Sequence, residues 1–359
     1  MDRFALVLAL TVTAGWLPSL AVAQTRQPFA IAGKQVAAGT RLDLDLSVPA
    51  GTSDPATSIP VTVFHGAKPG PVVALTMGVH GYEYPPILAG QALLSRIDPT
   101  VLSGTVLMVR IAHLAAFEQR VVYVNPYDRK NLNRVFPGKA DGTQAERIAW
   151  ALSTDVIRRC DLHVELHSGD GAEWLDDFVG IYGGARAAAQ YADSRKMGLA
   201  FGIRSVVKYS MDTAAQVDNG RSLNRQAVAE GKPTILVEVG ENGRRDPAFV
   251  ATIVGGVENL LRTFGMVAGT PSAPRADTRW FDNTAEAEST RTGIFTPVSS
   301  RARDVRKGEL LGTVTDYQGR EVERILSPVD GYVMYGLAGP SVRAGEAVVT
   351  IGIAAPGPL

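Results

Sequence analysis

The sequence predicts an α/β fold in which helices flank a mixed, largely parallel sheet, followed by a small all-β domain that resembles a barrel. Apolar runs typical of strands alternate with segments whose apolar residues recur at helical spacing. Beyond residue 270 only short strand-like pieces, separated by turns, remain. At 359 residues the chain is longer than one comfortable core, which favours a large and a smaller domain.

The predicted strands of the large domain are short and apolar. The run over 71–77 is apolar almost throughout, as expected of a strand that is buried on both faces. Strands are predicted over 60–64, 71–77, 105–111, 161–166 and 234–239, and helices over 85–97, 144–156 and 247–264. In such a sheet, functional sites lie beyond the carboxyl ends of the strands.

A stretch rich in Gly, Pro, Ala and Ser over 269–274 is typical of a linker. We therefore expect a large domain over 24–268 and a β-rich domain over 275–359. The strand-like pieces of the second domain fall over 293–295, 310–314, 317–320, 325–329 and 332–335.

The N-terminus predicts a secretory signal peptide over residues 1–23. A charged start at Arg3 precedes an apolar run over 4–17, and Ala21-Val22-Ala23 forms a cleavage site. An uncleaved membrane anchor is the weaker alternative, because Pro18 follows a run too short for a comfortable bilayer span. We expect a periplasmic or secreted protein that leaves the membrane after cleavage.

The charge balance argues against polyanionic partners, and the cysteine content excludes an internal disulfide. Lys+Arg and Asp+Glu both number 36, so no net field attracts nucleic acid or an acidic membrane. The single cysteine, Cys160, cannot form an internal disulfide and is expected to be a small buried hydrophobic residue.

A candidate metal site follows the strand over 71–77. His80 and Glu83 lie three residues apart where the chain turns, so an imidazole and a carboxylate can converge on one cation. Catalytic zinc commonly takes two histidines and one carboxylate and leaves a position for water. Taken alone, this short motif favours a surface or capping role over metal ligation.

The strand over 161–166 offers two further histidines. Alternation places His163, Glu165 and His167 on one side of the strand. His167 lies at the strand end beside a glycine turn and is favoured as a ligand, whereas His163 is mid-strand and is expected to be an interior, hydrogen-bonded histidine.

The polar loop over 126–138 carries a candidate substrate-binding pair. Arg134 can clamp a carboxylate with two parallel hydrogen bonds, and Asn133 can orient it or bind another substrate oxygen. A structural Arg–Asp pair within the loop is an equally good interpretation.

A carboxylate interrupts the apolar strand over 234–239. Burial of the Glu238 carboxylate in this strand would destabilise the fold, so a functional role is indicated. Partial burial would raise the pKa of Glu238 into the range of a general base. A structural glutamate paired with a basic neighbour is the alternative. Glu241, in the following polar loop, is the competing candidate and is expected to be solvated.

Four motifs together resemble the succinylglutamate desuccinylase/aspartoacylase family of zinc carboxypeptidase-like hydrolases. The residues 78–83 are similar to its G-x-H-G-x-E metal motif, 131–138 to its N-L-N-R-x-F-P-G loop, 165–169 to its D-L-H strand end, and 237–240 to its E-x-G strand. One departure is Glu165, where the family usually has Asp.

The resemblance implies one zinc ion per chain on His80, Glu83 and His167, with Glu238 as general acid and base. It also implies that Asn133 and Arg134 bind a substrate carboxylate. Further arginines surround the substrate in this family, and Arg129, Arg221 and Arg225 are candidates among which no motif chooses.

The second domain resembles the biotinyl/lipoyl-like barrel that this family appends. Carrier domains of that type need a lysine at their hairpin, and the stretch over 332–336 has none. We therefore expect no covalent cofactor, and a lid or homo-oligomerisation role instead.

These features predict an exported zinc-dependent hydrolase that removes the acyl group from an N-acyl amino acid or a related amide. One alternative is a zinc metallocarboxypeptidase that acts on peptides, cell-wall peptides among them. The other, from a different class, is a non-catalytic exported protein that binds metal or ligand.

Overall fold

The computed structural model describes residues 1, 26–218, 221–298 and 301–359, so the predicted signal peptide lies almost wholly outside the described residues. The helices are α1 (Tyr84–Leu93), α2 (Leu114–Glu118), α3 (Gln144–Asp155), α4 (Tyr191–Phe201), α5 (Ala214–Asp218), α6 (Leu223–Ala229) and α7 (Pro247–Thr263), with 3₁₀ turns η1 (Leu132–Arg134), η2 (Ile157–Arg159) and η3 (Ala185–Ala187). The N-terminal strands are β1 (Phe29–Ile31), β2 (Lys34–Val36), β3 (Thr40–Val48), β4 (Thr57–His65), β5 (Lys68–Met77), β6 (Ser103–Val109), β7 (Leu162–His167), β8 (Glu173–Leu175), β9 (Phe178–Gly183), β10 (Ser205–Ser210) and β11 (Thr234–Glu238). The C-terminal strands are β12 (Arg279–Ser289), β13 (Gly293–Pro297), β14 (Asp304–Val305), β15 (Leu310–Thr315), β16 (Glu321–Leu326), β17 (Gly331–Leu337), β18 (Ser341–Val342) and β19 (Glu346–Ala354).

One mixed sheet runs through the molecule in the order β14-β17-β19-β12-β10-β9-β11-β7-β5-β6-β4-β3, with β8 paired to β17. Its centre is parallel, since β7 pairs in parallel with both β5 and β11. The strand β9 is antiparallel to β11 and parallel to β10, which gives the sheet its mixed character. The predicted α/β fold with a mixed sheet is thereby confirmed.

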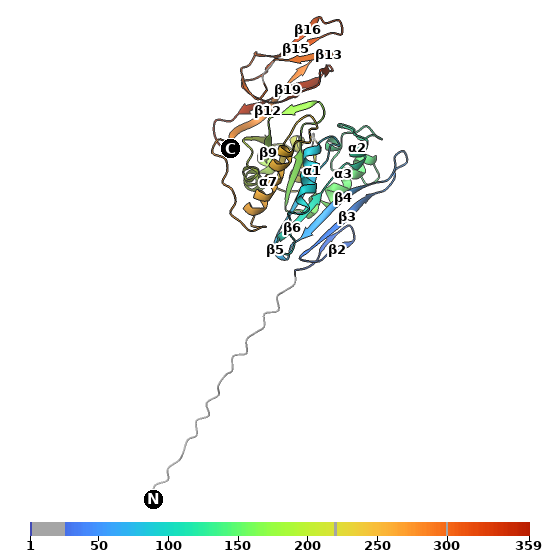
Figure 1. The fold of residues 1–359 in the computed structure, drawn as a ribbon, viewed down its shortest axis with the longest axis vertical. Helices are drawn as coiled ribbons and strands as arrows, with labels where there is room; N and C mark the ends of the chain where they lie inside the picture. The colour runs from blue at the N-terminus through green and yellow to red at the C-terminus, as the bar shows by residue number, and fades with distance from the viewer. Residues whose placement is uncertain (2–25, 219–220, 299–300) are drawn as a thin grey trace.

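Helices cover both faces of the sheet and enclose two apolar cores. On one face α1, α4 and α7 pack together over residues such as Leu75, Val164 and Val237, and α1 and α7 lie in front of the sheet in Figure 1. On the other face α3 and α6 cover a second core that includes Leu107, Ile148 and Cys160. Cys160 is buried, as predicted.

The C-terminal strands form an antiparallel module at the top of Figure 1. The strands β16, β15, β13 and β18 make a separate sheet, whereas β12, β17 and β19 continue the main sheet. The join is direct, because β12 pairs in parallel with β10. The predicted linker falls in the irregular segment between α7 and β12, but the sheet continues across the predicted boundary.

Two strand predictions are corrected. The piece over 317–320 is a turn between β15 and β16, in which the backbone N–H groups of Gln318 and Arg320 donate to Asp316 Oδ1. The predicted strand over 325–329 is wrong beyond Leu326, where β16 ends, because Ser327 turns the chain through a hydrogen bond from its hydroxyl to the carbonyl of Val329. The polar loop over 126–138 contains one 3₁₀ turn, η1, because the Asn131 side chain accepts a hydrogen bond from the Asn133 backbone and caps it.

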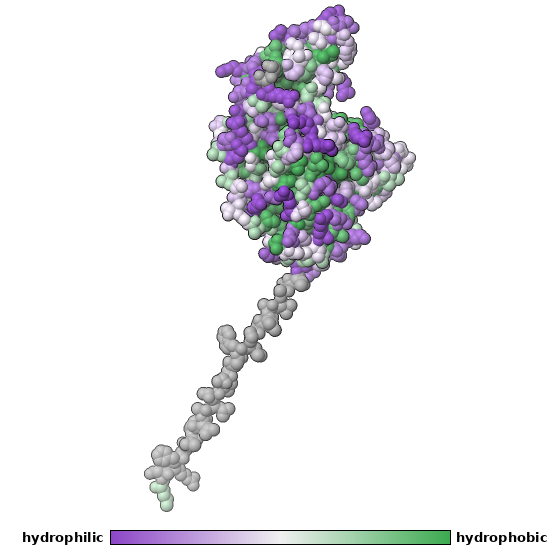
Figure 2. Space-filling view, viewed as in Figure 1, coloured by the Kyte–Doolittle hydropathy of each residue, from purple (hydrophilic) through white to green (hydrophobic). Residues whose placement is uncertain are grey.

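Polar residues cover most of the C-terminal module, while apolar residues come to the surface around the middle of the main body (Figure 2). Within the described residues, none of the helices is both long and apolar enough to cross a membrane.

Candidate active site

The site lies where three neighbouring parallel strands, β5, β7 and β11, reach their carboxyl ends. A tight turn after β5 carries His80 and Glu83, and the turn starts at Gly78, whose φ of +66° suits glycine. The helix α1 begins directly after Glu83, with proline in its first turn. Local sequence thus fixes both side chains at one edge of the sheet.

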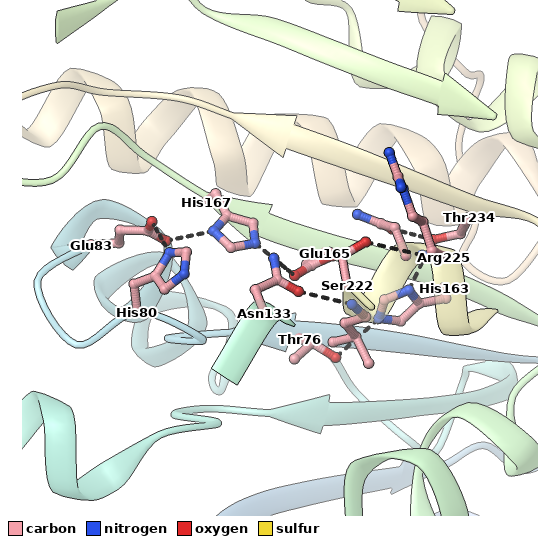
Figure 3. Close-up of polar contacts among 12 residues, drawn as sticks. Thr76, His80, Glu83, Asn133, His163, Glu165, His167, Ser222, Arg225 and Thr234 are labelled. Carbon is pink, nitrogen blue, oxygen red and sulfur yellow. Dashed lines mark hydrogen bonds and ion pairs between the residues drawn. The ribbon is translucent and has the colours of Figure 1, made fainter. Parts of the chain in front are cut away.

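His80, Glu83 and His167 converge in a buried cluster (Figure 3). The Nδ1 atoms of His80 and His167 lie 2.7 Å and 2.8 Å from the two oxygens of Glu83. One ligand atom from each of the three residues lies within 4.8 Å of the others. Two imidazoles and one carboxylate, facing an open cavity, are the donor set that suits catalytic zinc.

The structure separates the two strand histidines. His163 lies between the hydroxyls of Thr76 and Thr234, at 3.2 Å and 2.9 Å, and is buried in the sheet. His167 reaches the cluster at the strand end. The ligand set predicted from sequence is thus brought together, and the competing His163 is not part of it.

The buried carboxylates and imidazoles of the site shift one another's pKa values. Burial alone would lower the pKa of His167, but the carboxylates of Glu83 and Glu165 raise it well above its usual value. Burial likewise opposes ionisation of Glu83, yet His167 and His80 lower its pKa to about 2. Glu83 is therefore held as a carboxylate between two imidazoles in a buried place.

Outer partners hold each imidazole in orientation. His167 Nε2 lies 2.7 Å from Glu165 Oε1, and His80 Nε2 lies 3.2 Å from Asn131 Oδ1. Such partners fix the ring orientation of metal-ligating histidines. The sequence did not single out Asn131 for this role; its place in the loop opposite the cluster is visible only in the fold.

Both polar atoms of the Asn133 side chain form hydrogen bonds within the protein. Its Nδ2 donates to Glu165 at 3.0 Å, and its Oδ1 accepts from the backbone N–H of Leu223 at 2.8 Å. Its neighbour Arg134 is exposed at the cavity, and its guanidinium donates to the Asn133 carbonyl at 2.8 Å. The predicted role of Asn133 in substrate binding stays a prediction, and the amide also supports Glu165.

Glu238 ends β11 and lies opposite His167 in the register of the parallel pair. Burial raises the pKa of Glu238 well above its usual value; His167 opposes this rise, and Glu83 and Glu173 add to it. Glu241 lies outside the cavity lining and pairs with Arg244 and Arg301.

A cavity of about 840 Å³ opens over these residues. Of the three further arginines that the sequence offered, Arg225 lines it, while Arg129 and Arg221 are exposed elsewhere. The C-terminal strands β12, β17 and β19 form part of its wall, through residues such as Tyr335. No sequence pattern marked Tyr335, because it reaches the site only through the continued sheet.

The fold and the site together define a zinc carboxypeptidase-like α/β architecture with a His–Glu–His cluster at the carboxyl edge of its sheet. A family model described as "Succinylglutamate desuccinylase/Aspartoacylase catalytic domain" matches residues 69–264. The chain belongs to the succinylglutamate desuccinylase/aspartoacylase family, whose members are deacylases that act on N-acyl amino acids.

Named relatives agree with this assignment. The chain is 29% identical over 269 residues to an N-alpha-acetyl-L-2,4-diaminobutyric acid deacetylase from Halomonas elongata, covering 73% of this chain and 75% of the relative. A succinylglutamate desuccinylase/aspartoacylase structure from Rhodobacter sphaeroides matches with a TM-score of 0.75 at 25% identity, over 87% of this chain and 95% of that one. The product-bound ectoine utilization protein EutE (DoeB) from Ruegeria pomeroyi shares the fold, with a TM-score of 0.79 at 23% identity over 91% and 99% of the two chains.

Proposed function

We propose that the protein is a zinc-dependent deacylase that hydrolyses the amide bond of an N-acyl amino acid. The observation that carries this proposal is the convergence of His80, Glu83 and His167 beside Glu238, at the floor of a cavity that Arg134 and Arg225 also line. One zinc ion would be held by the two Nδ1 atoms and the Glu83 carboxylate. When bound, zinc supplies an activated water and polarises the scissile carbonyl.

The remaining roles belong to side chains of this chain. Glu238, whose pKa burial raises, accepts a proton from the attacking water and donates it to the departing amine. Arg134 and Arg225 bind the substrate carboxylate, because a guanidinium can donate two parallel hydrogen bonds to it. The products are a carboxylic acid and an amino acid.

Replacing the general base tests this assignment. Glu238→Gln should retain stoichiometric zinc but lose turnover by about a thousandfold or more, since it keeps the shape of the side chain and removes its proton-accepting role. Glu241→Gln is the matched control, because Glu241 lies just beyond the same strand and outside the cavity. Metal analysis and a deacylation assay on both variants are the measurements. An active, zinc-loaded Glu238→Gln protein would refute the role of Glu238.

A substrate panel separates the proposed reaction from peptide cleavage. N-acyl amino acids should be hydrolysed faster than peptides that end in the same amino acid, because C-terminal strands close one side of the cavity. Preferential release of C-terminal residues from peptides would instead identify a metallocarboxypeptidase. Stoichiometric metal with no hydrolysis of either class would identify a binding protein.

We also propose that the protein is exported after removal of residues 1–23. Arg26, three residues beyond that cleavage site, donates to the carbonyls of Gly66 and Gly104 at 2.8 Å and 2.7 Å, so the chain contacts the folded body soon after the proposed new N-terminus. Edman sequencing of the native protein should give Gln24 as the first residue. A cytoplasmic protein that retains the leader would contradict this proposal.

A further inference from the structure

The cavity carries an excess of negative charge that deacylation does not require. Six carboxylates line it against two arginines. The carboxylates are Glu83, Asp170, Glu173, Glu238, Glu286 and Glu346, and the arginines are Arg134 and Arg225. A divalent cation on the His–Glu–His cluster would still leave the cavity negative. Such a cavity disfavours an acylated dicarboxylic acid and favours a substrate that brings positive charge.

Asp170 is the carboxylate that most lacks a partner. It follows β7 by three residues, is 0% exposed and lines the cavity. Its Oδ1 accepts from the backbone N–H of Ala172 at 3.0 Å, but its Oδ2 has no hydrogen-bond partner among the described residues. A buried carboxylate oxygen without a partner is costly, so a missing donor is implied. Ser168 Oγ, on the same loop and cavity wall, is also buried without a partner among them.

Glu173 stands behind Asp170 and is already fully engaged. The hydroxyls of Tyr123 and Tyr335 both donate to its Oε1, and the backbone N–H of Asp170 lies 3.3 Å from its Oε2. Glu173 therefore adds negative charge beside Asp170, while the open acceptor is Asp170 Oδ2.

This acidic pair adjoins the proposed metal site. The ring of Tyr123 meets that of His80 edge-on, with centroids 5.3 Å apart, and Tyr123 in turn donates to Glu173. The backbone N–H of Gly169 donates to the carbonyl of Gly240 at 2.8 Å, which ties the loop of Asp170 to the end of β11. A substrate held at the cluster can therefore extend toward Asp170.

The chemistry of the missing partner is that of an organic ammonium group. A second metal ion would need at least a third ligand, and the described residues contain only one such group, His80, Glu83 and His167. An ammonium offers three N–H donors and a positive charge, which suit one open carboxylate oxygen with a hydroxyl on the same loop.

We propose that Asp170, backed by Glu173, binds an ammonium group on the side chain of the substrate, so that the enzyme prefers N-acyl derivatives of diamino acids. The inference rests on the proposed deacylase function and names its substrate class. Arg134 and Arg225 bind the carboxylate of this substrate, and Asp170 binds its ammonium group.

Matched substrate pairs test the preference. The Nα-acetyl derivatives of 2,4-diaminobutyrate, ornithine and lysine are compared with those of 2-aminobutyrate, norvaline and norleucine, and Nα-acetylaspartate supplies the anionic case. The best cationic member should exceed its neutral partner in kcat/KM by about tenfold or more, as expected for a charge-assisted hydrogen bond. No preference for any cationic member, or a preference for aspartate, would overturn the proposal.

A single substitution assigns the preference to Asp170. Asp170→Asn keeps the acceptor for Ala172 and removes the charge, so it should abolish the preference, mainly through KM. Glu286→Gln is the matched control, because it removes one charge from the exposed C-terminal wall of the same cavity and should retain the preference. If the preference survives in Asp170→Asn, or falls equally in Glu286→Gln, Asp170 is not the ammonium site.

Direct binding distinguishes failure of this proposal from failure of the proposed function. Calorimetric titration with free 2,4-diaminobutyrate and 2-aminobutyrate needs no turnover. Tighter binding of the diamino acid to the original protein but not to Asp170→Asn would support the ammonium site even if no N-acyl substrate is hydrolysed. Hydrolysis without a charge preference, together with equal binding of both amino acids, would refute the ammonium site and leave the deacylase intact.

Discussion

At the scale of single residues, the site depends on buried carboxylates that touch no solvent and serve neighbouring groups. Glu165 is the clearest case: it is 0% exposed, its Oε1 accepts from Asn133 and contacts His167, and its Oε2 has no partner among the described residues. Glutamate stands here where the family usually has aspartate, and Asn133 supports the longer side chain. A buried charge of this kind is retained at a cost to stability, which indicates a role in orienting His167.

We expect Glu165→Gln to weaken zinc binding by about 10- to 100-fold, because the partner of His167 loses its charge. Competition with a chromophoric chelator measures the affinity. Glu241→Gln, a glutamate outside the cavity, should bind zinc as tightly as the original protein. Unchanged affinity in Glu165→Gln would show that the carboxylate does not act through His167.

The pH dependence of stability should report Asp170. Burial raises the pKa of this carboxyl from 3.8 to about 6. A carboxyl whose pKa rises on folding stabilises the protein below about pH 4, and this contribution is lost as the pH rises through about 6. In the metal-free protein, the free energy of unfolding of Asp170→Asn should therefore rise by about 2 kcal/mol relative to that of the original protein between pH 4.5 and pH 7.5. Denaturant unfolding at both pH values measures it, and a pH-independent difference would contradict the assignment.

At the scale of elements, the turn between β5 and α1 positions two proposed ligands because it packs directly on α2. A Cβ atom at Gly81 would collide with the backbone of Ala116 and Phe117. Glycine at this position lets the two backbones approach closely, which sets the place of the whole turn.

Gly81→Ala should displace this turn, weaken zinc binding and lower the melting temperature. Gly255→Ala is the matched control, because Gly255 lies in α7 with open space around its Cα, and alanine there should be neutral or stabilising by up to about 1 kcal/mol. Thermal denaturation and metal titration of both variants provide the comparison. A Gly81→Ala protein with normal zinc affinity would show that the turn is not held by this contact.

Elements with strong local patterns were predictable from sequence, whereas their partners were not. The runs over 71–77 and 234–239 became β5 and β11 because continuous apolar sequence must be buried on both faces. Nothing local indicated that β9 pairs antiparallel with β11 or that β12 pairs with β10, because these contacts join distant parts of the chain. The candidate site residues that lie in the four motifs could be nominated for the same reason, because each motif is a local sequence pattern.

The site residues that escaped prediction lack such a local pattern. Asp170 lies in a polar turn after β7 and Glu173 begins the short strand β8 that follows, and only their burial reveals them. Tyr335 lies in a strand that the sequence predicts over 332–335, but it enters the cavity only because β17 pairs with β8. Tertiary placement, which the sequence does not display, therefore brought these residues into the cavity wall.

At the scale of the whole molecule, the two predicted domains share one sheet and should unfold together. A cluster of Val207, Phe281, Tyr332 and Met334 joins β10 to β12 and β17, so separating the parts would expose apolar surface and a strand edge. We expect a single transition in scanning calorimetry of the full chain. Two transitions, with the second assignable to residues 275–359, would show that the C-terminal part folds independently.

The continued sheet also sets when the protein can first act. A ribosome delivers the chain N-terminus first, so the motif residues of the cluster are made long before Tyr335 and the strand β19. Until those last strands are released, Glu173 lacks one of its two phenol donors and the cavity lacks a wall. A nascent chain can therefore carry every proposed metal ligand and still have no complete pocket, and selectivity is acquired only as synthesis ends.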